Sequence, residues 1–426
     1  MNSDLVSRNR SAELFLLTKN SEKCGIFELE LDKSVDVDVL RSAVDEAVKR
    51  LPLIASEMVR SGEEFYYTKN NRPVVIVRED GLPVLGTEQT NHHAICLIVR
   101  EKTIIIPFHH SLTDGVGMER FIGTLMYYYH TALTGSQIDP ESVRINDCMD
   151  HPDVWEDPFD HFYEVSDGSG NSGPMHPVTD GLVLPENEGE PEYRRFFMEI
   201  DTDDFMRFSK SEGTSPMIAS TLLMMHAIRK EIPDSDKPIA IRFPVDIRHH
   251  LGTEETLRNA VLMKPMRYTP ATMDSLSFRE QARILRGQLD DGTAEQEIKG
   301  SVNGFIALMN QMDEQGTMEK KRAFLRNARK PDTTAFLLSY VRCMWPEEVQ
   351  RGICEFGAVD LEPYLKINIW AMKKSFFVDI IQPFTTSRYV EAFAGQLKSR
   401  GITVSWKEKE LKLPDYDLDG LMDNIT

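Results

Sequence analysis

A long acidic segment divides this chain and constrains its fold more than any other feature. Residues 147–193 contain thirteen aspartates or glutamates and no lysine or arginine. Two stretches within it, residues 167–174 and 185–192, are rich in glycine, proline and polar residues, which is typical of a loop or linker. Because 426 residues exceed what one hydrophobic core usually fills, we predict two lobes, residues 1–146 and 194–426, joined by a linker at residues 147–193.

The same segment accounts for most of the negative charge of the chain. The formal net charge is −19, but outside residues 147–193 there are 55 acidic and 49 basic residues, a net of −6. Binding to nucleic acid depends on clustered basic residues that neutralise phosphates, and the chain has no such general basic field. We therefore expect no nucleic-acid partner.

Composition indicates a soluble globular protein. Hydrophobic residues make up 41% of the chain and charged residues 27%, which excludes disordered, collagen-like and coiled-coil classes. No apolar run approaches the roughly 18–20 residues that a membrane-spanning helix needs, and residues 1–10 lack the apolar segment of a signal peptide. These observations predict a cytoplasmic protein without a membrane span.

The five cysteines predict neither a disulfide framework nor a metal site. They are odd in number, scattered along the chain, and in no CxxC or Cys/His spacing. We expect reduced, mostly buried thiols and no bound metal.

Strands and helices are mixed in both halves without a regular strand–helix–strand repeat. This arrangement argues for mixed α/β layers in each half. Apolar residues recurring every second position predict strands, and those recurring every three to four positions predict helices. The predicted strands are residues 64–68, 74–78, 94–100, 103–108, 195–200, 239–247, 335–341, 365–372, 375–381 and 402–407. The predicted helices are residues 37–50, 115–133, 216–230, 277–289, 297–311 and 387–400, with a short helix from residue 202.

One heptad, residues 109–115 (HHSLTDG), carries the clearest chemical signal. It lies between the predicted strand 103–108 and the helix that begins at Gly115. Neighbouring residues at a strand end point to opposite sides, so one of His109 and His110 can face a cleft while the other packs inside. Histidine is the usual general base near neutral pH, and Asp114 can cap the helix. Taken singly, these residues are equally consistent with two surface histidines before a capped helix.

The heptad as a whole resembles the HHxxxDG active-site motif of the chloramphenicol acetyltransferase superfamily. That superfamily includes acetyltransferases, condensation domains of peptide synthetases, plant HxxxD acyltransferases and bacterial alcohol acetyltransferase-like proteins. Further segments resemble the alcohol acetyltransferase-like branch in the same order. They are residues 50–52 (RLP), 65–73 (FYYTKNNRP), 244–248 (PVDIR), 255–259 (ETLRN) and 338–340 (LSY). The chain departs from the plant branch, because residues 354–357 (CEFG) match its DFGWG element poorly, and Arg342 replaces a glycine that often follows LSYV.

The resemblance implies the fold and the kind of reaction. It implies a pseudo-dimer of two chloramphenicol-acetyltransferase-like lobes, the first ending in the heptad's helix, with a tunnel between them. It also implies an acyltransferase that moves an acyl group from a thioester, acyl-CoA or a phosphopantetheine thioester, to a hydroxyl or amine of a small molecule. The thioester is then a cosubstrate, and no tightly bound cofactor is expected.

The resemblance also implies the roles of individual residues. His110 would be the general base, with His109 and Gly115 supporting the turn. Asp114 would hold the loop through an ion pair with an arginine, either Arg248 or Arg50, although Arg248 could equally pair with Asp246. Further implied positions are Ser339, as a hydrogen-bond donor to the oxyanion or an ordinary strand hydroxyl, and Asn259, by motif match alone.

The densest basic stretch does not distinguish between acyl-CoA and a carrier-bound thioester as the acyl donor. Lys320, Lys321 and Arg322 would attract the phosphates of coenzyme A or an acidic carrier protein, but a solvated helix face explains them as well. Two other functions remain alternatives. One is a free-standing condensation-type enzyme that uses thioesters on an acyl carrier protein, and the other is a non-catalytic relative that binds a metabolite or partner.

Overall fold

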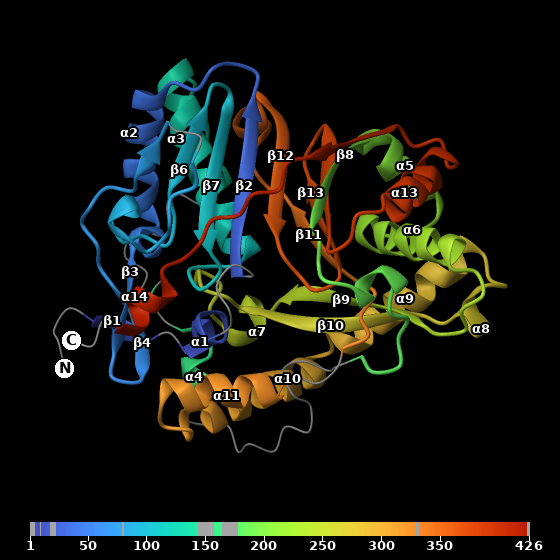
Figure 1. Ribbon diagram of the computed structural model, residues 1–426. Coiled ribbons are helices and arrows are strands. Elements are labelled where there is room, and N and C mark those ends of the chain that lie inside the picture. The colour runs from blue at the N-terminus through green and yellow to red at the C-terminus, as the bar shows by residue number, and fades with distance from the viewer. Residues whose placement is uncertain are drawn as a thin grey trace.

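The structure is a computed structural model that describes residues 5–8, 10–17, 23–78, 81–143, 155, 157–163, 178–328 and 332–423. It contains a five-stranded sheet, a seven-stranded sheet and a small three-stranded sheet (Figure 1). Among the described residues, no helix is long and apolar enough to cross a membrane. The mixed α/β architecture predicted from the sequence is confirmed.

The five-stranded sheet carries the heptad at the end of its central strand. Its order is β12 (Ile353–Asp360), β2 (Cys24–Leu31), β7 (Thr103–His109), β6 (Leu97–Arg100) and β5 (Ile76–Val77). Helices α2 (Val37–Arg50) and α3 (Gly115–Thr134) pack on one face of it (Figure 1). The small sheet has the order β1 (Leu5–Arg8), β4 (Glu64–Thr68) and β3 (Glu57–Ser61).

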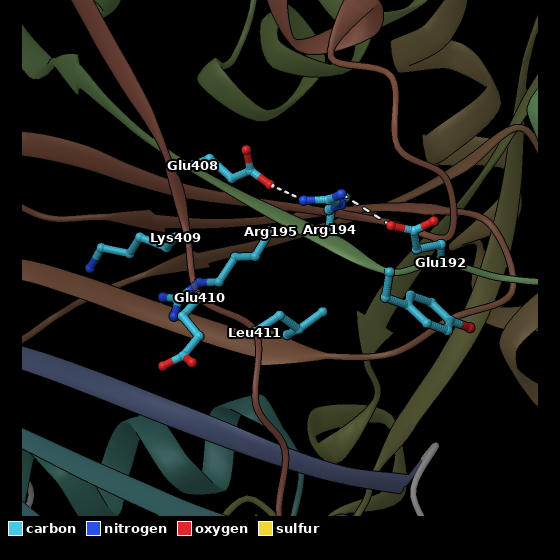
Figure 2. Close-up of a pocket in the computed structure, with 8 residues that line it drawn as sticks. Glu192, Arg194, Arg195, Glu408, Lys409, Glu410 and Leu411 are labelled. Carbon is cyan, nitrogen blue, oxygen red and sulfur yellow. Dashed lines mark hydrogen bonds and ion pairs between the residues drawn. The ribbon is translucent and has the colours of Figure 1, made fainter. Parts of the chain in front are cut away.

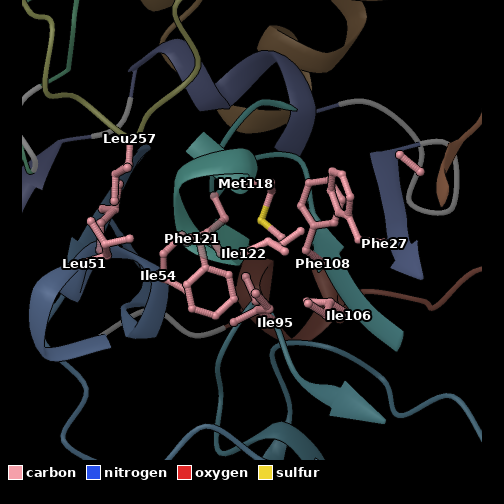
Figure 3. Packing of buried hydrophobic residues seen from close by; sticks show 14 of the residues in the cluster. Phe27, Leu51, Ile54, Ile95, Ile106, Phe108, Met118, Phe121, Ile122 and Leu257 are labelled. Carbon is pink, nitrogen blue, oxygen red and sulfur yellow. The ribbon is translucent and has the colours of Figure 1, made fainter. Parts of the chain in front are cut away.

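Buried side chains fix α3 against β7. Phe108 and Ile106 of β7 share one core with Met118, Phe121 and Ile122 of α3 (Figure 3). All five side chains are at most 4% exposed. Burying a large apolar side chain stabilises a fold by roughly 1.5–3 kcal/mol, so this contact holds the turn between β7 and α3 in a fixed frame.

The seven-stranded sheet forms the second half. Its order is β10 (Val261–Tyr268), β9 (Ile239–Asp246), β11 (Phe336–Arg342), β13 (Leu365–Ala371), β14 (Ser375–Gln382), β8 (Arg194–Asp201) and β15 (Val404–Lys409). One face packs against α5 (Thr202–Ser211), α6 (Pro216–Glu231), α9 (Phe278–Gly292) and α13 (Arg388–Lys398). The remaining helices are α1 (Arg10–Leu16), α4 (Asp160–Tyr163), α7 (Arg248–Leu251), α8 (Pro270–Met273), α10 (Glu295–Asp313), α11 (Met318–Ala328), α12 (Glu347–Gln350) and α14 (Leu418–Asp423).

Capping residues set several helix starts as the sequence indicates. Ser215 caps α6 by accepting a hydrogen bond from the Ile218 amide, and Pro216 occupies the first helical position, where a missing N–H costs nothing. Ser277 and Glu280 form a reciprocal capping box at α9. The sequence predicted no strand at the positions of β1, β2, β3, β10 or β12.

Strand β12 does not follow the sequence division into two lobes. It comes from the C-terminal half of the chain, yet it pairs antiparallel with β2 from Ile353↔Leu31 to Asp360↔Gly25. The chain's end also returns, since Tyr416 forms a parallel bridge with Leu85. Two segments of the predicted region 194–426 therefore pair with strands or loops of the predicted region 1–146.

Part of the predicted linker is packed against the protein. Of residues 147–193, the structure describes 155, 157–163 and 178–193. Phe159 is 2% exposed and packs on Phe305 of α10, with ring centroids 4.4 Å apart. The buried Asp157 carboxylate accepts a hydrogen bond from the Ser11 amide of α1 at 2.8 Å. These residues of the predicted linker therefore pack against the protein, while residues 164–177 lie outside the described part of the chain.

A buried ion cluster joins the two large sheets. The Arg195 guanidinium of β8 is 1% exposed, and it contacts Asp379 of β14 at 2.7 Å and Glu28 of β2 at 2.8 Å. Lys409 of β15 contacts Glu28 at 2.7 Å. Burial opposes ionisation of Glu28, but Arg195 and Lys409 outweigh it and lower its pKa to about 2.

A cavity of about 650 Å³ opens beside Arg195 and Lys409 of this cluster (Figure 2). Its lining contains none of the site residues predicted from the sequence. It is formed by Glu192, Tyr193, Arg194, Arg195, Glu408, Lys409, Glu410 and Leu411.

Replacing Arg195 tests whether this cluster holds the halves together. Arg195→Met should lower the free energy of unfolding by about 3–5 kcal/mol, because Asp379 is left as an uncompensated buried charge. Arg194→Met is the matched control, since Arg194 is 41% exposed and its replacement should leave stability close to that of the wild type. Urea titrations of the two variants give the comparison. Equal stabilities would show that the cluster does not contribute.

Candidate active site

The turn between β7 and α3 is built around Asp114. Asp114 caps α3 by accepting a hydrogen bond from the Gly117 amide at 3.0 Å. A Cβ atom at Gly117 would lie 1.9 Å from Thr113 Oγ1 and 2.6 Å from the Leu257 carbonyl oxygen, so only glycine fits. This close approach brings the loop that contains Leu257 against the start of α3.

Arg248 crosses from the C-terminal half to hold Asp114. Its Nη2 donates to both Asp114 oxygens, at 2.8 and 2.9 Å, and both side chains are almost fully buried. The Ala260 amide donates to the same carboxylate at 3.0 Å. Arg248 also contacts Asp246 at 3.0 Å, so both pairings considered from the sequence are present, whereas Arg50 donates to the Tyr128 hydroxyl instead.

The electrostatics of Asp114 follow from these contacts. Burial by itself would raise the pKa of the carboxyl group, but Arg248 and two backbone amides outweigh that effect and lower it. Asp114 is therefore ionised, and its oxygens are occupied by partners within the protein. In this geometry Asp114 orders the turn and does not point at a substrate.

His110 follows directly after β7 and is a partly buried residue. Its amide donates to the Lys23 carbonyl at 2.8 Å. The ring stacks on Phe15 of α1, with centroids 4.9 Å apart and planes 4° from parallel, and also contacts Phe108 at 5.7 Å. Removal of water from around the ring disfavours its charged form and lowers the pKa of His110, so the imidazole is neutral at neutral pH.

Asn259 sets the tautomer of His110. Its Nδ2 donates to the His110 carbonyl at 2.7 Å, which turns Oδ1 towards the ring nitrogen Nδ1, 3.2 Å away. An amide oxygen only accepts hydrogen bonds, so Nδ1 must carry the proton. The lone pair of the neutral ring is then on Nε2, the nitrogen that can act as a base.

His109 lies on the other side of the strand. It is fully buried, hydrogen-bonds Ser111 Oγ through Nδ1 at 2.7 Å, and stacks on Tyr416 with centroids 4.3 Å apart. Burial, followed by the nearby His110 and Lys23, lowers its pKa to about 3. His109 is thus a neutral packing residue that joins β7 to the returning C-terminal segment.

The structure brings some of the remaining predicted residues near the turn. Gly115 approaches β11, because a Cβ there would lie 3.9 Å from Val341. Ser339 is half-buried on β11, opposite Asn368 of β13. Within the described ranges, no hydrogen bond links Ser339 to His110 or Asn259.

One residue of the basic stretch on α11, Lys321, is not placed to bind a phosphate. Lys321 is 2% exposed, and its Nζ contacts Asp313 at 3.0 Å, Glu13 at 3.2 Å and the Glu63 carbonyl at 2.9 Å. Its ammonium is already paired with acids inside the protein, so it does not present a charge to a phosphate. Lys320 is exposed and Arg322 is half-exposed, and both are accessible to ligands.

Sequence reasoning missed a second polar group on the same face as His110. Asp360 of β12 forms an ion pair with Lys366 of β13, and Asn368 Nδ2 donates to Asp360 at 3.1 Å. The signal was present in the sequence of β13, LKINIWA, where Lys366 and Asn368 alternate with large apolar residues. Polar residues at every second position of a buried strand indicate one polar face.

Comparison with solved structures finds the same fold over nearly the whole chain. TRI101 of F. graminearum, in complex with coenzyme A and deoxynivalenol, is 12% identical with a TM-score of 0.58, covering 91% of this chain and 96% of that one. TRI3 trichothecene 15-O-acetyltransferase from Fusarium sporotrichioides is 13% identical with a TM-score of 0.61, covering 92% and 94%. The first condensation domain of the CDA synthetase is 12% identical with a TM-score of 0.58, covering 94% and 95%.

These likenesses establish the fold. The chain has the same fold as these three structures, so the fold expected from the resemblance of residues 109–115 is confirmed. No protein-family model and no curated protein sequence matches the chain.

Replacing Arg248 tests the role of the ion pair in holding the turn. Arg248→Met should lower the free energy of unfolding by about 3–5 kcal/mol at neutral pH, because Asp114 loses its buried counter-ion. Asp246→Asn removes only the partner that is 41% exposed and should cost less than about 1 kcal/mol.

The loss should also depend on pH. The pKa of Asp114 is lower in the folded than in the unfolded state, so the pair stabilises the fold above the unfolded pKa and loses this effect as pH falls through the folded pKa. The difference between wild type and Arg248→Met should therefore shrink on acidification. A difference that stays constant with pH would rule out this electrostatic origin.

Proposed function

We propose that this protein is an acyltransferase that moves an acyl group from a thioester to a hydroxyl or amine of a small molecule, with His110 as the general base. The observation that carries the proposal is the bond between His110 Nδ1 and Asn259, because it leaves the lone pair on Nε2. A general base needs an available lone pair and access to substrate; the bond to Asn259 supports the first, and the second is part of the proposal.

The proposed reaction needs no covalent enzyme intermediate. His110 Nε2 accepts the proton of the acceptor hydroxyl or amine as that oxygen or nitrogen forms a bond to the thioester carbonyl carbon. The tetrahedral intermediate then collapses, the carbon–sulfur bond breaks, and the thiolate takes the proton from Nε2. The acylated product and the free thiol leave, and the imidazole returns to its neutral form.

Other residues act on position and charge in this proposal. Asp114 and Arg248 hold the turn that carries His110, as their mutual contacts at 2.8 and 2.9 Å support. Ser339 is proposed to donate a hydrogen bond to the oxyanion, an interaction that strengthens as charge develops. Holding donor and acceptor together between two lobes would make the attack effectively unimolecular.

The proposed donor is acyl-CoA. Two structures with the same fold support it, since TRI101 is in complex with coenzyme A and TRI3 is a 15-O-acetyltransferase. Lys320 and Arg322 are proposed to contact the donor's phosphates, and Lys321 is left out because it is buried in ion pairs. Coenzyme A is a substrate in this proposal and not a resident cofactor.

A carrier-bound thioester is the alternative donor. The likeness to the first condensation domain of the CDA synthetase favours a condensation-type enzyme that accepts acyl groups from an acyl carrier protein. Turnover with matched acyl-CoA and acyl-carrier-protein donors separates the two. Faster release of product from the carrier protein would favour the condensation-type reaction.

Replacing His110 tests the proposed mechanism. His110→Ala should reduce thiol release by roughly 10²–10⁴-fold, the usual effect of removing a positioned base, and should leave the fold intact. His249→Ala is the matched control, because His249 is 86% exposed on α7 and should leave turnover unchanged. Thiol release is measured with a panel of acyl-CoA donors and acceptors. Near-wild-type release by a folded His110→Ala variant would contradict the mechanism.

A further inference from the structure

Asp360 shares one face of the five-stranded sheet with His110. Asp360 of β12 lies opposite Gly25 of β2, which in turn lies opposite Phe108 of β7. Residues opposite each other on neighbouring strands point to the same face, so Asp360 and Phe108 are on one side of the sheet. The His110 ring packs on Phe108 on that same side.

Gly25 lets the Phe108 ring lie over β2 in the row between them. A Cβ atom at Gly25 would lie 2.7 Å from Phe108 Cε1 and 3.1 Å from the Val359 carbonyl oxygen. Because β2 contributes no side chain at this row, none from that strand separates Asp360 from the rings of Phe108 and His110. The charge of Asp360 is among those that act on His110.

The Asp360 carboxylate is held in place from the neighbouring strand. Lys366 pairs with its Oδ2, and Asn368 Nδ2 donates to its Oδ1 at 3.1 Å and to the Ala358 carbonyl at 2.8 Å. The side chains of Asp360 and Lys366 are 17% and 8% exposed. A carboxylate bound at both oxygens and mostly buried has a fixed position, which is what electrostatic preorganisation requires.

Several charged groups face His110 from the elements around it. Desolvation lowers the pKa of His110 most; Asp360 raises it, Lys366 and Lys23 lower it, and Asp114 raises it. Asp360 itself faces Lys366 and His110, which both lower its pKa against the opposing effect of burial. The buried hydroxyl of Tyr364 and the neutral ring of His109 are the other titratable groups nearby.

We propose that Asp360 is a positioning residue that stabilises the protonated imidazole of His110 during acyl transfer, and that Lys366 holds and moderates its charge. This inference rests on the proposed function. His110 is cationic only between uptake of the acceptor's proton and its delivery to the thiolate. Asp360 stabilises that cation, as a fixed negative charge does in a site with little water, while the proton itself stays on Nε2.

The inference predicts opposite effects for the two members of the pair. Asp360→Asn removes the negative charge and leaves Lys366 in place, so it should lower the pKa of His110 by about 1 unit. Lys366→Met removes the positive charge and should raise that pKa. The double variant should return towards the wild-type value, because both charges are absent.

The experiment reads the protonation of His110 directly, without substrate. Protein labelled with ¹⁵N-histidine is titrated by NMR, and His110→Gln assigns the His110 ring signals. Lys264→Met is the matched control for loss of a buried lysine. Lys264 lies on β10, is 3% exposed, and donates hydrogen bonds to Ser301 and to the Glu297 carbonyl of α10. This control should not move the His110 signals, whereas a general loosening of the fold would move them.

The outcomes separate this inference from the proposed function. Opposite shifts in Asp360→Asn and Lys366→Met, mirrored in the acid limb of the kcat/KM profile, support it. If both variants shift the His110 pKa in the same direction, or neither shifts it, the inference is overturned. If one variant does not fold, the direction of the pKa shift in the other decides. If the two variants shift the His110 pKa in opposite directions but the wild-type protein cleaves no thioester, the charge coupling is supported and the proposed function is contradicted.

Discussion

The buried ion pair between Asp114 and Arg248 is the interaction on which the candidate site depends. Asp114 ends the turn that carries His110, and Arg248 comes from the C-terminal half of the chain. The same arginine donates to the Arg258 carbonyl, next to Asn259. One pair of charges therefore fixes both the turn that carries His110 and the amide that sets its tautomer. Breaking such a pair is costly because the remaining charge stays buried.

The candidate site is built from both halves of the chain, since the C-terminal half supplies several residues that contact or surround the turn. Strand β12 extends the first sheet and carries Asp360, and Tyr416 returns to stack on His109. The Arg195 cluster then ties β8 and β14 to β2. The orientation of His110 thus reports on the packing of both halves, so variants far from it in sequence can change its chemistry.

The sequence indicated the fold and the turn because both depend on local patterns. The heptad, the capping residues and the strand periods are short-range signals, and they predicted the α/β architecture that the structure shows. Strand β12 escaped prediction because its pairing with β2 joins residues more than three hundred positions apart. No local pattern encodes such a partner.

Two charged positions show how burial changes the meaning of a motif. Lys321 looked like part of a basic surface, but helical spacing puts it on the same face as the buried Met318 and Leu325, where acids from other elements pair with it. Lys366 alternates with apolar residues on β13 and was a readable signal of a polar face. That Asp360 is the acidic partner of Lys366 could not be predicted without the position of β12 in the sheet.

A crystal structure with a non-hydrolysable thioether analogue of acyl-CoA, together with an acceptor, tests the central claim most directly. The account predicts that the analogue's carbonyl lies between the lobes, with the acceptor atom near His110 Nε2 and about 3–3.5 Å from the carbonyl carbon. An analogue bound elsewhere, for example in the cavity lined by Arg194 and Lys409, with His110 untouched, would contradict it.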